Sequence, residues 1–397
     1  MPRVREGGAA VRPATVLLVF LLCLSTTLAL RLRTDVLTPN TKDWDLPTDH
    51  HKYIYIAEHP IGSFHIQPAC WRLGVPLLTR ALPFSTYRSF DALSVLFLSL
   101  CGVLIYLWLR AVPRSPLEAL LGVILFYSLG AASKLLLQGV VSPDPASYFF
   151  ILVALYAIYK GNDFLCAAAL ALGVLTKETV ALAGPLFYSL KATRLWDASR
   201  FKRFLLVFAP CVCILVAVRI LIPAWNDRDD YVQSLPFIYT QVSAGQVKYD
   251  LKTAFLGTID TYRAVTSINL VRLFSYGSLG LQLFLPFFAL GPNKQVLLRW
   301  APYWIPILAS LLIALNADRR LGSLFPVLIV MGLNGVGQLG AKLNAGMADF
   351  CVIFSLQLLL LLLSKDVQIV PFDLAAAVFL LSLAWLVARE RQRTVPV

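Results

Sequence analysis

The chain has 397 residues, of which 58% are hydrophobic and only 14% are charged. A soluble surface needs more polar cover than this, and apolar runs of membrane-span length recur from end to end, so a soluble globular protein is excluded. The net charge of +13 does not indicate nucleic-acid binding, because the basic residues stand in short clusters between apolar runs, as membrane topology requires.

These apolar runs predict helices rather than strands. They lack the alternation of a barrel strand, and backbone polar groups inside a bilayer must be satisfied within the segment. We therefore expect an all-α polytopic fold of about twelve transmembrane helices, built as one integral membrane domain over residues 1–397. The predicted spans are 14–31, 90–109, 117–139, 145–159, 164–176, 179–190, 204–222, 270–290, 300–315, 321–338, 350–363 and 372–388.

The basic clusters predict the orientation of the chain in the cell membrane. They fall at the N-terminus, in alternate loops and in the C-terminal tail, so the positive-inside rule places both termini in the cytoplasm. The first span has one alternative interpretation, a signal peptide cleaved near residues 27–29. Loops 32–89 and 223–269 are then extracytoplasmic, and the polar groups that could do chemistry lie on that same side.

The first outer loop supplies the candidate general base. Asp45 and Asp49 are both carboxylates near the membrane surface, where a carboxylate can accept the proton of a neighbouring hydroxyl. Asp49 is preferred because it opens a segment that places Tyr53 at helical spacing, so it could cap an interfacial helix and be held in place. The alternative is that these carboxylates are ordinary solvated loop charges.

The adjacent histidines His50 and His51 follow Asp49 directly. Imidazole and carboxylate groups are a normal metal-ligand set, but side chains of neighbouring residues diverge on a helix and no HExxH-type spacing is present. We expect structural or interfacial histidines and no metal, with a divalent ion as the less favoured alternative.

Four ionisable residues stand at or inside the apolar runs that follow. Lys134 is expected within the third span, where it could reach out to the interface or pair with a lipid phosphate. Lys177 and Glu178 interrupt two short runs near the outer face, as a cavity-facing pair or as plain surface charges. Asp144 stands between two prolines, where it could cap the fourth span. Glu178 and Asp45 are further acidic candidates.

Arg319 and Arg320 break the positive-inside trend, because they stand on the predicted outer face. Guanidinium groups bind phosphate with two parallel hydrogen bonds. Two arginines beside Asp318 therefore suggest a clamp for a phosphate or pyrophosphate. A salt bridge between loops is an equally good interpretation.

Several of these segments together resemble one family. The first outer loop contains an aspartate that is followed by several short sequence segments, and this pattern resembles that of the polytopic GT-C glycosyltransferases and their bacterial relatives. The likeness is spread over about residues 1–330. The segments are Tyr53 with Ala57, Trp71–Pro76, Leu175–Thr179 with Pro185, and Asp318-Arg319 followed by Phe325-Pro326. Arg72, inside the second segment, is a further candidate ligand for the donor phosphate.

The resemblance implies a reaction. Such enzymes move a sugar from a polyprenyl-phosphate donor to a glycan, lipid or protein acceptor at the outer face, without an organic cofactor. Asp49 would then be the base of an inverting transfer and Asp144 the second acidic position, while basic residues stabilise the phosphate leaving group. The alternative is a transporter or flippase of a lipid-linked or small anionic substrate, which would predict inverted repeats that the sequence does not show.

Overall fold

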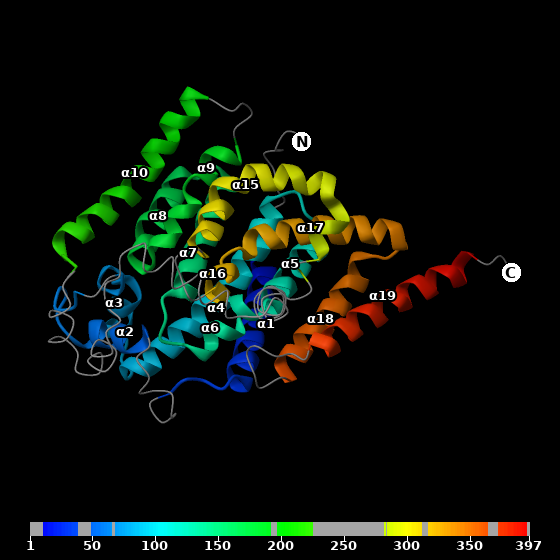
Figure 1. The fold of residues 1–397 in the computed structure, drawn as a ribbon, viewed down its shortest axis with the longest axis horizontal. Coiled ribbons are helices and arrows are strands. Elements are labelled where there is room, and N and C mark those ends of the chain that lie inside the picture. The colour runs from blue at the N-terminus through cyan, green and yellow to red at the C-terminus, as the bar shows by residue number, and fades with distance from the viewer. Residues whose placement is uncertain are drawn as a thin grey trace.

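The computed structural model describes residues 11–38, 49–65, 68–191, 197–224, 282, 284–311, 317–363 and 372–394. Within these ranges the chain is all-α and contains no strand (Figure 1). The helices are α1 (Pro13–Arg33), α2 (Asp49–Glu58), α3 (Gly74–Ala81), α4 (Thr86–Ala111), α5 (Pro116–Ser128), α6 (Lys134–Gln138), α7 (Asp144–Lys160), α8 (Asp163–Thr176), α9 (Leu186–Ser189), α10 (Ala198–Leu221), α15 (Leu290–Ser310), α16 (Ala317–Gly322), α17 (Phe325–Leu343), α18 (Met347–Leu363) and α19 (Phe372–Thr394).

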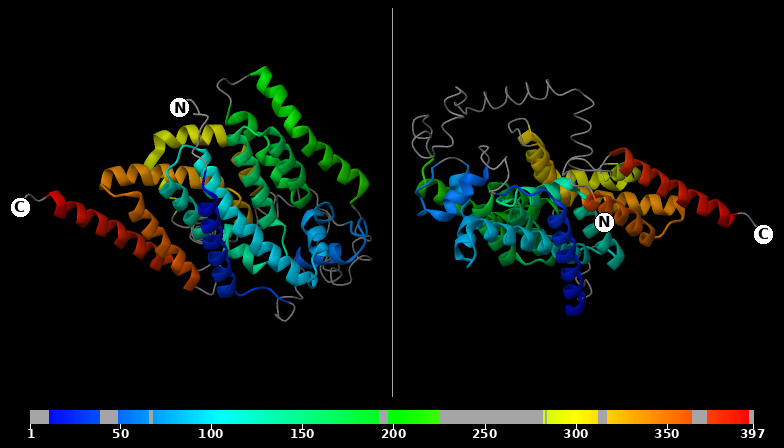
Figure 2. Two further views of the ribbon diagram at one scale, coloured as in Figure 1. Left: turned by 180° about the vertical axis from the view of Figure 1, so that it is seen from behind. Right: turned by 90° about the horizontal axis from the view of Figure 1, so that it is seen from below.

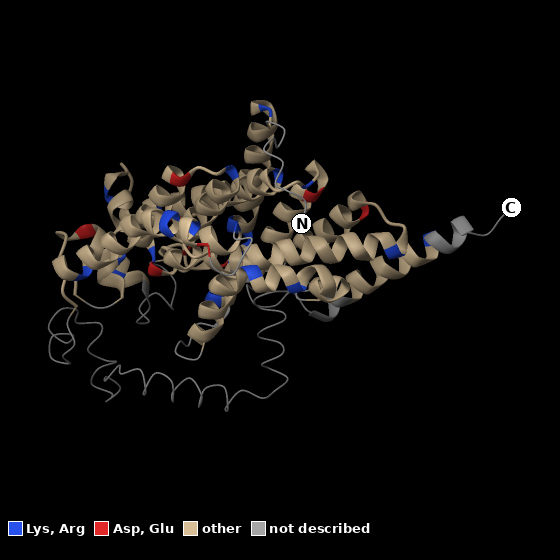
Figure 3. Cartoon of the chain, turned by 90° about the horizontal axis from the view of Figure 1, so that it is seen from above, with Lys and Arg blue, Asp and Glu red and all other residues tan. Residues whose placement is uncertain are grey.

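Four of the described helices are long and apolar enough to cross a membrane, namely α1, α4, α10 and α17. Shorter apolar helices accompany them, including α5, α8 and α18. Charged residues are sparse along the helices and stand mostly near their ends (Figure 3). The chain is therefore a multi-pass membrane protein, although the described residues show four helices of full span length rather than the twelve expected.

The predicted third span, 117–139, is not one helix. α5 ends at Ser128, a 3₁₀ turn η3 (Gly130–Ala132) follows, and α6 begins at Lys134. The Ser133 hydroxyl lies 2.9 Å from the carbonyls of both Tyr127 and Leu129, and the Leu129 carbonyl also accepts from the Ser133 amide at 3.1 Å. The side chain thus supplies a hydrogen-bond partner for the Tyr127 carbonyl where the helix is interrupted. Hydropathy alone does not register such a break.

The predicted sixth span, 179–190, is also not a single helix. It consists of a 3₁₀ helix η4 (Glu178–Ala183) and the four-residue α9. Gly184 and Pro185 both keep right-handed helical backbone angles. Pro185 has no amide hydrogen to donate, and the Ala181 carbonyl instead accepts from Gly184 at 2.9 Å, so regular hydrogen bonding is interrupted between the two pieces. Span 300–315 belongs to α15, which starts earlier, and span 321–338 begins later, at Phe325, because residues 317–322 form the separate helix α16.

α4 is the central helix of the bundle and packs against α1, α5 and α7. Its Trp108 is fully buried, with its ring centroid 6.0 Å from that of Trp300. Arg31 of α1 forms a bidentate ion pair with Asp91 of α4, with bonds of 2.7 and 2.9 Å. α10 and α19 lie at opposite edges of the molecule (Figures 1 and 2). Their exposed leucines fit a lipid-facing position.

A second, smaller apolar core lies at one end of the bundle. It is formed by residues of α2, the 3₁₀ turn η2 (Ala69–Trp71), α3 and the first turns of α4, among them Tyr53, Ile56 and Phe90. Figure 1 shows α2 and α3 beside the C-terminal end of α10. This core holds the first loop against the ends of α7 and α8, where most of the predicted charged side chains meet.

Candidate functional site

Charged side chains from distant parts of the chain meet at one group of helix ends. Lys177, just after α8, pairs with the carboxylate of Asp144, the first residue of α7. Arg319 of α16 lies on the other oxygen of that carboxylate, at 3.0 Å. The structure therefore joins three of the predicted side chains directly, as one ionic triad.

Ser142 completes the surroundings of Asp144. Its hydroxyl donates to the carboxylate at 2.6 Å and accepts from the Arg319 guanidinium at 2.7 Å. Pro143 precedes the helix and Pro145 follows Asp144. The proline rings restrict the backbone φ angles on both sides of Asp144, where α7 begins. Asp144 is only 2% exposed. Its carboxylate is thus an enclosed anchor for two cations.

A second ionic group stands next to the triad. Arg72 donates to both carboxylate oxygens of Glu178, with the Nε bond at 2.9 Å, and its third donor reaches the Tyr53 hydroxyl, also at 2.9 Å. Glu178 follows Lys177 in the chain, so the two groups are contiguous. The planar guanidinium matches the carboxylate geometry, which a lysine could not do.

Arg320 differs from the other basic residues of the site in its partners. Among the described residues it makes no hydrogen bond or ion pair, although it is half-buried. It lies close enough to Glu178, Arg72 and Asp144 for their charges to act on it. We call these eight residues the charged cluster: Tyr53, Arg72, Ser142, Asp144, Lys177, Glu178, Arg319 and Arg320.

The electrostatics of the charged cluster favour an added anion. Among the side chains that the structure describes here, four basic groups face two carboxylates, an excess of two positive charges. Burial is the largest influence on Arg320 and lowers its pKa, and the charge of Arg72 acts in the same direction, so the carboxylates of Glu178 and Asp144 offset the shift only in part. For Glu178, burial raises the pKa, but the charge and hydrogen bond of Arg72, a backbone N–H and the charge of Lys177 together lower it by more, so the carboxylate stays ionised.

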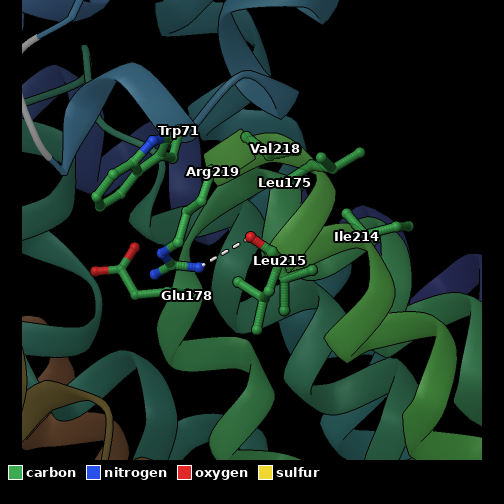
Figure 4. A pocket seen from close by; sticks show the side chains of 8 residues that line it. Trp71, Leu175, Glu178, Ile214, Leu215, Val218 and Arg219 are labelled. Atoms are coloured by element: carbon green, nitrogen blue, oxygen red, sulfur yellow. Dashed lines mark hydrogen bonds between the residues drawn. The ribbon is translucent and has the colours of Figure 1, made fainter. Parts of the chain in front are cut away.

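A small pocket adjoins the charged cluster at Glu178 (Figure 4). Val174 and Leu175 of α8 and Ile214, Leu215 and Val218 of α10 form its apolar walls. Arg219 of α10 lies over the ring of Trp71, 4.7 Å from its centroid, and donates to the Leu215 carbonyl at 3.2 Å. The Trp71 indole donates to the Ile222 carbonyl at 2.9 Å, which attaches the first loop to the end of α10.

The other predicted site residues lie elsewhere or outside the described residues. Lys134 is buried at the start of α6 rather than inside a continuous span, and its ammonium donates to the Leu361 carbonyl at 3.1 Å. Asp49 is the first residue of α2, in agreement with the predicted interfacial helix, but the structure does not describe its side chain. Asp45 lies outside the described residues. The rings of His50 and His51 do not diverge as expected, since their centroids are 4.0 Å apart.

The residues of the charged cluster do not fit a divalent metal. Both described carboxylates are already paired with cations, which would repel a second positive charge. Among the described residues, no group of three histidine, cysteine, aspartate or glutamate side chains is placed to hold a metal ion. An anion suits the site better than a cation does.

Sequence reasoning missed Ser142 and Arg219. Ser142 has a signal, because a serine two residues before an aspartate can bond its side chain at the start of a helix. Arg219 gave no signal of its own, since a basic residue at the end of an apolar helix is usual at a membrane interface. Only the fold shows that Trp71 lies beneath it.

Comparison with known proteins supports the fold but gives no family by sequence. No protein-family model matches the chain, and no curated protein matches it. The fold is similar to the oligosaccharyltransferase of Archaeoglobus fulgidus, solved with a tethered acceptor peptide that contains the NVT sequon (TM-score 0.52, 12% identity, 95% of this chain and 55% of that one). A structure of the same enzyme with zinc and sulfate gives a TM-score of 0.48 at 15% identity, over 93% and 53% of the two chains.

The first of these matches identifies the kind of fold. The archaeal enzyme is a membrane glycosyltransferase of the GT-C type, and this chain spans about half of its length. The fold expected from the sequence resemblance is thereby confirmed as GT-C-like. The identity of 12% carries the comparison no further than the fold.

Proposed function

We propose that this protein is a membrane glycosyltransferase that moves a hexosyl or pentosyl group from a polyprenyl-phosphate donor to an acceptor at the extracytoplasmic face. The observation that carries the proposal is the excess of positive charge in the charged cluster, where the half-buried Arg320 has no ion-pair partner among the side chains that the structure describes. A phosphate would supply the charge that this guanidinium lacks. The GT-C-like fold supports a sugar phosphate as that anion.

The pocket beside Glu178 supports a donor that is attached to a lipid. Its walls are apolar side chains of α8 and α10, and the outward face of α10 carries exposed leucines and isoleucine. A ligand with a phosphate head and a hydrocarbon tail could place the head at the charged cluster and the tail toward the membrane. A nucleotide sugar would gain nothing from that apolar surface.

The proposed reaction assigns a role to each part of the site. Asp49 accepts the proton of the acceptor hydroxyl, whose oxygen attacks the anomeric carbon from the side opposite the phosphate. The bond from this carbon to the phosphate oxygen breaks, and the polyprenyl phosphate leaves with an added negative charge. Arg320, with Arg72 and Lys177 near it, stabilises that charge.

The two carboxylates of the charged cluster then serve to hold cations, not to accept protons. Asp144 is enclosed by Lys177, Arg319 and Ser142, and an acceptor hydroxyl would have to displace one of them. The base is therefore better sought on α2, at Asp49, than at Asp144. With both termini in the cytoplasm, α2 and the charged cluster lie on the outer side.

The proposal is tested with the full chain in lipid nanodiscs and a panel of radiolabelled polyprenyl-phosphate hexoses and pentoses. We expect release of polyprenyl phosphate and label in an acceptor fraction from membrane extracts, with the product of opposite anomeric configuration. Arg320→Gln should reduce transfer at least tenfold. Arg88→Gln, at an exposed arginine at the start of α4, is the matched control and should retain full transfer.

Two results would contradict the proposal. One is the movement of labelled donor between the leaflets of proteoliposomes with its sugar–phosphate bond intact and no transfer, which would favour the flippase alternative. The other is an unchanged affinity for polyprenyl phosphate in Arg320→Gln, which would remove the proposed phosphate site.

A further inference from the structure

The short helix α2 receives its C-terminal cap from another helix. The Arg80 guanidinium of α3 donates to the carbonyls of Ile56 and Ala57, both at 3.0 Å, and also to the carbonyl of His59. The last carbonyls of a helix have no partner within it, and a cation there also complements the helix dipole. α2 has no basic residue in its own last turn, so Arg80 supplies what its sequence lacks.

The position of α2 decides where two site residues lie. Tyr53, in the middle of α2, accepts a hydrogen bond from Arg72, and Asp49 is the first residue of the helix. A helix of ten residues is about 15 Å long, so a tilt of about 10° at the capped end moves the other end by about 2.5 Å. A shift of only about 1 Å in a catalytic group can reduce the rate a hundredfold.

α3 connects this cap to the charged cluster. At its N-terminal end, Gly74 lies directly against the last turn of α8, where a Cβ would come within 2.9 Å of Thr176 Cγ2 and 3.1 Å of the Leu175 carbonyl carbon. Thr176 is followed by Lys177 and Glu178. α3 is therefore fixed against α8 at one end and holds α2 with Arg80 at the other.

We propose that Arg80 is a positioning residue of the site: it sets the position of α2, and with it Asp49 and Tyr53, relative to the other residues of the charged cluster. This inference rests on the proposed transfer reaction. Arg80 touches neither donor nor acceptor in this scheme and acts only through the α2 backbone. Its loss should therefore affect the chemical step more than donor binding, because Arg72 stays fixed by Glu178 and Arg320 belongs to α16.

The test compares Arg80→Gln with Arg88→Gln, another exposed arginine of the same loop region, in nanodiscs. Amide hydrogen exchange of the peptide covering residues 49–59 reports on α2 without any substrate. Transfer from the labelled donor is measured in parallel as kcat and as KM for the donor. In Arg80→Gln we expect faster exchange in α2, a kcat at least tenfold lower and a KM within threefold of the parent. Arg80→Lys keeps the positive charge but not the planar guanidinium with its several N–H donors, so its kcat should lie between those of Arg80→Gln and the parent protein.

The outcomes separate this inference from the proposed function. Faster exchange in α2 with an unchanged kcat would overturn the positioning role, and so would unchanged exchange. A fall in kcat matched by an equal fall in Arg88→Gln would do the same. If the parent protein transfers no sugar from any donor, the proposed function fails, and faster exchange in Arg80→Gln would then show Arg80 as a cap of α2 without a role in transfer.

Discussion

Arg72 and Glu178 form a bidentate ion pair across 106 residues of sequence. The pair attaches the loop between α1 and α4 to the end of α8, beside the Asp144–Lys177 pair. It thus brings a loop carrying the proposed base next to helix ends carrying the proposed phosphate site. Because this one contact joins the two halves of the site, its loss should be measurable in both stability and function.

Removing the Arg72 side chain should destabilise the protein. Arg72→Ala leaves Glu178 without its partner, and the cost falls between that of an exposed pair and that of a buried one, about 1–3 kcal/mol, since Glu178 is 35% exposed. A double-mutant cycle with Glu178→Ala, followed by thermal unfolding in detergent, isolates the pair. Additive losses in the cycle would show that the two side chains do not interact.

The same pair should make stability depend on pH in acid. Burial raises the pKa of Glu178, but Arg72, a backbone N–H and Lys177 together outweigh it, so the pKa is lowered in the folded protein. Between the folded and the unfolded pKa the unfolded chain binds more protons, so this contribution is fully present above about pH 5 and is lost as the pH falls below about 4. Glu178→Gln should flatten the fall in Tm across that range.

A control for the pH series is Glu58→Gln, since Glu58 is exposed at the end of α2. Its pH dependence of Tm should match that of the parent protein. If Glu178→Gln gives the same acid slope as Glu58→Gln, the Arg72–Glu178 pair does not contribute to stability in this way.

Substitutions of Arg319 and Arg320 should have different effects on Tm and on ligand binding, although the sequence alone gave no reason to distinguish the two residues. Arg319 is engaged by Asp144 and Ser142, so Arg319→Gln should lower Tm and leave Lys177 as the main partner of Asp144. Arg320 has no partner within the described part of the chain, so Arg320→Gln should leave Tm nearly unchanged. It should weaken polyprenyl-phosphate binding by about tenfold or more, equal to about 1.4 kcal/mol. Titration of polyprenyl phosphate against the protein in nanodiscs measures the affinity. Equal effects of the two substitutions on Tm would contradict the assignment of Arg319 as paired and Arg320 as the phosphate ligand.

The sequence predicted the apolar helices and the gathering of charges on one side, but not the ion pairs. Hydropathy found α4 and α10 because long apolar runs have few alternatives in a bilayer. It missed the breaks after Ser128 and at Gly184, since these depend on local hydrogen bonds and proline geometry. It grouped Arg319 with Arg320 because pairing with Asp144, 175 positions away from Arg319, is a property of the fold.

The predicted orientation can be tested by labelling single cysteines from outside the cell. Glu58→Cys, at the exposed end of α2, should react with a membrane-impermeant maleimide, because α2 belongs to the outer loop. Lys202→Cys, exposed near the start of α10, should react only after permeabilisation. The parent protein gives the background of its own cysteines. Reaction of Lys202→Cys from outside would place the charged cluster on the cytoplasmic side.

The most decisive substitution is Asp49→Asn, because the transfer mechanism assigns its only base to that residue. Asparagine caps a helix about as well as aspartate, so α2 should keep its position, and hydrogen exchange over residues 49–59 should match the parent. The amide cannot accept the proton, however, and general-base catalysis contributes about 10²–10⁴-fold. Transfer should therefore fall by that factor, while binding of polyprenyl phosphate, which depends on Arg320, stays the same.

Asp45→Asn is the matched control for this experiment, since Asp45 precedes the helix that would hold the base. It should cost much less activity than Asp49→Asn. Near-normal transfer by Asp49→Asn would show that Asp49 only caps α2, and a larger loss in Asp45→Asn would move the base to Asp45. If both variants keep full transfer, neither carboxylate of the first loop is the base. Asp144 would then have to leave Lys177 and Arg319 to act, and Asp144→Asn should abolish transfer.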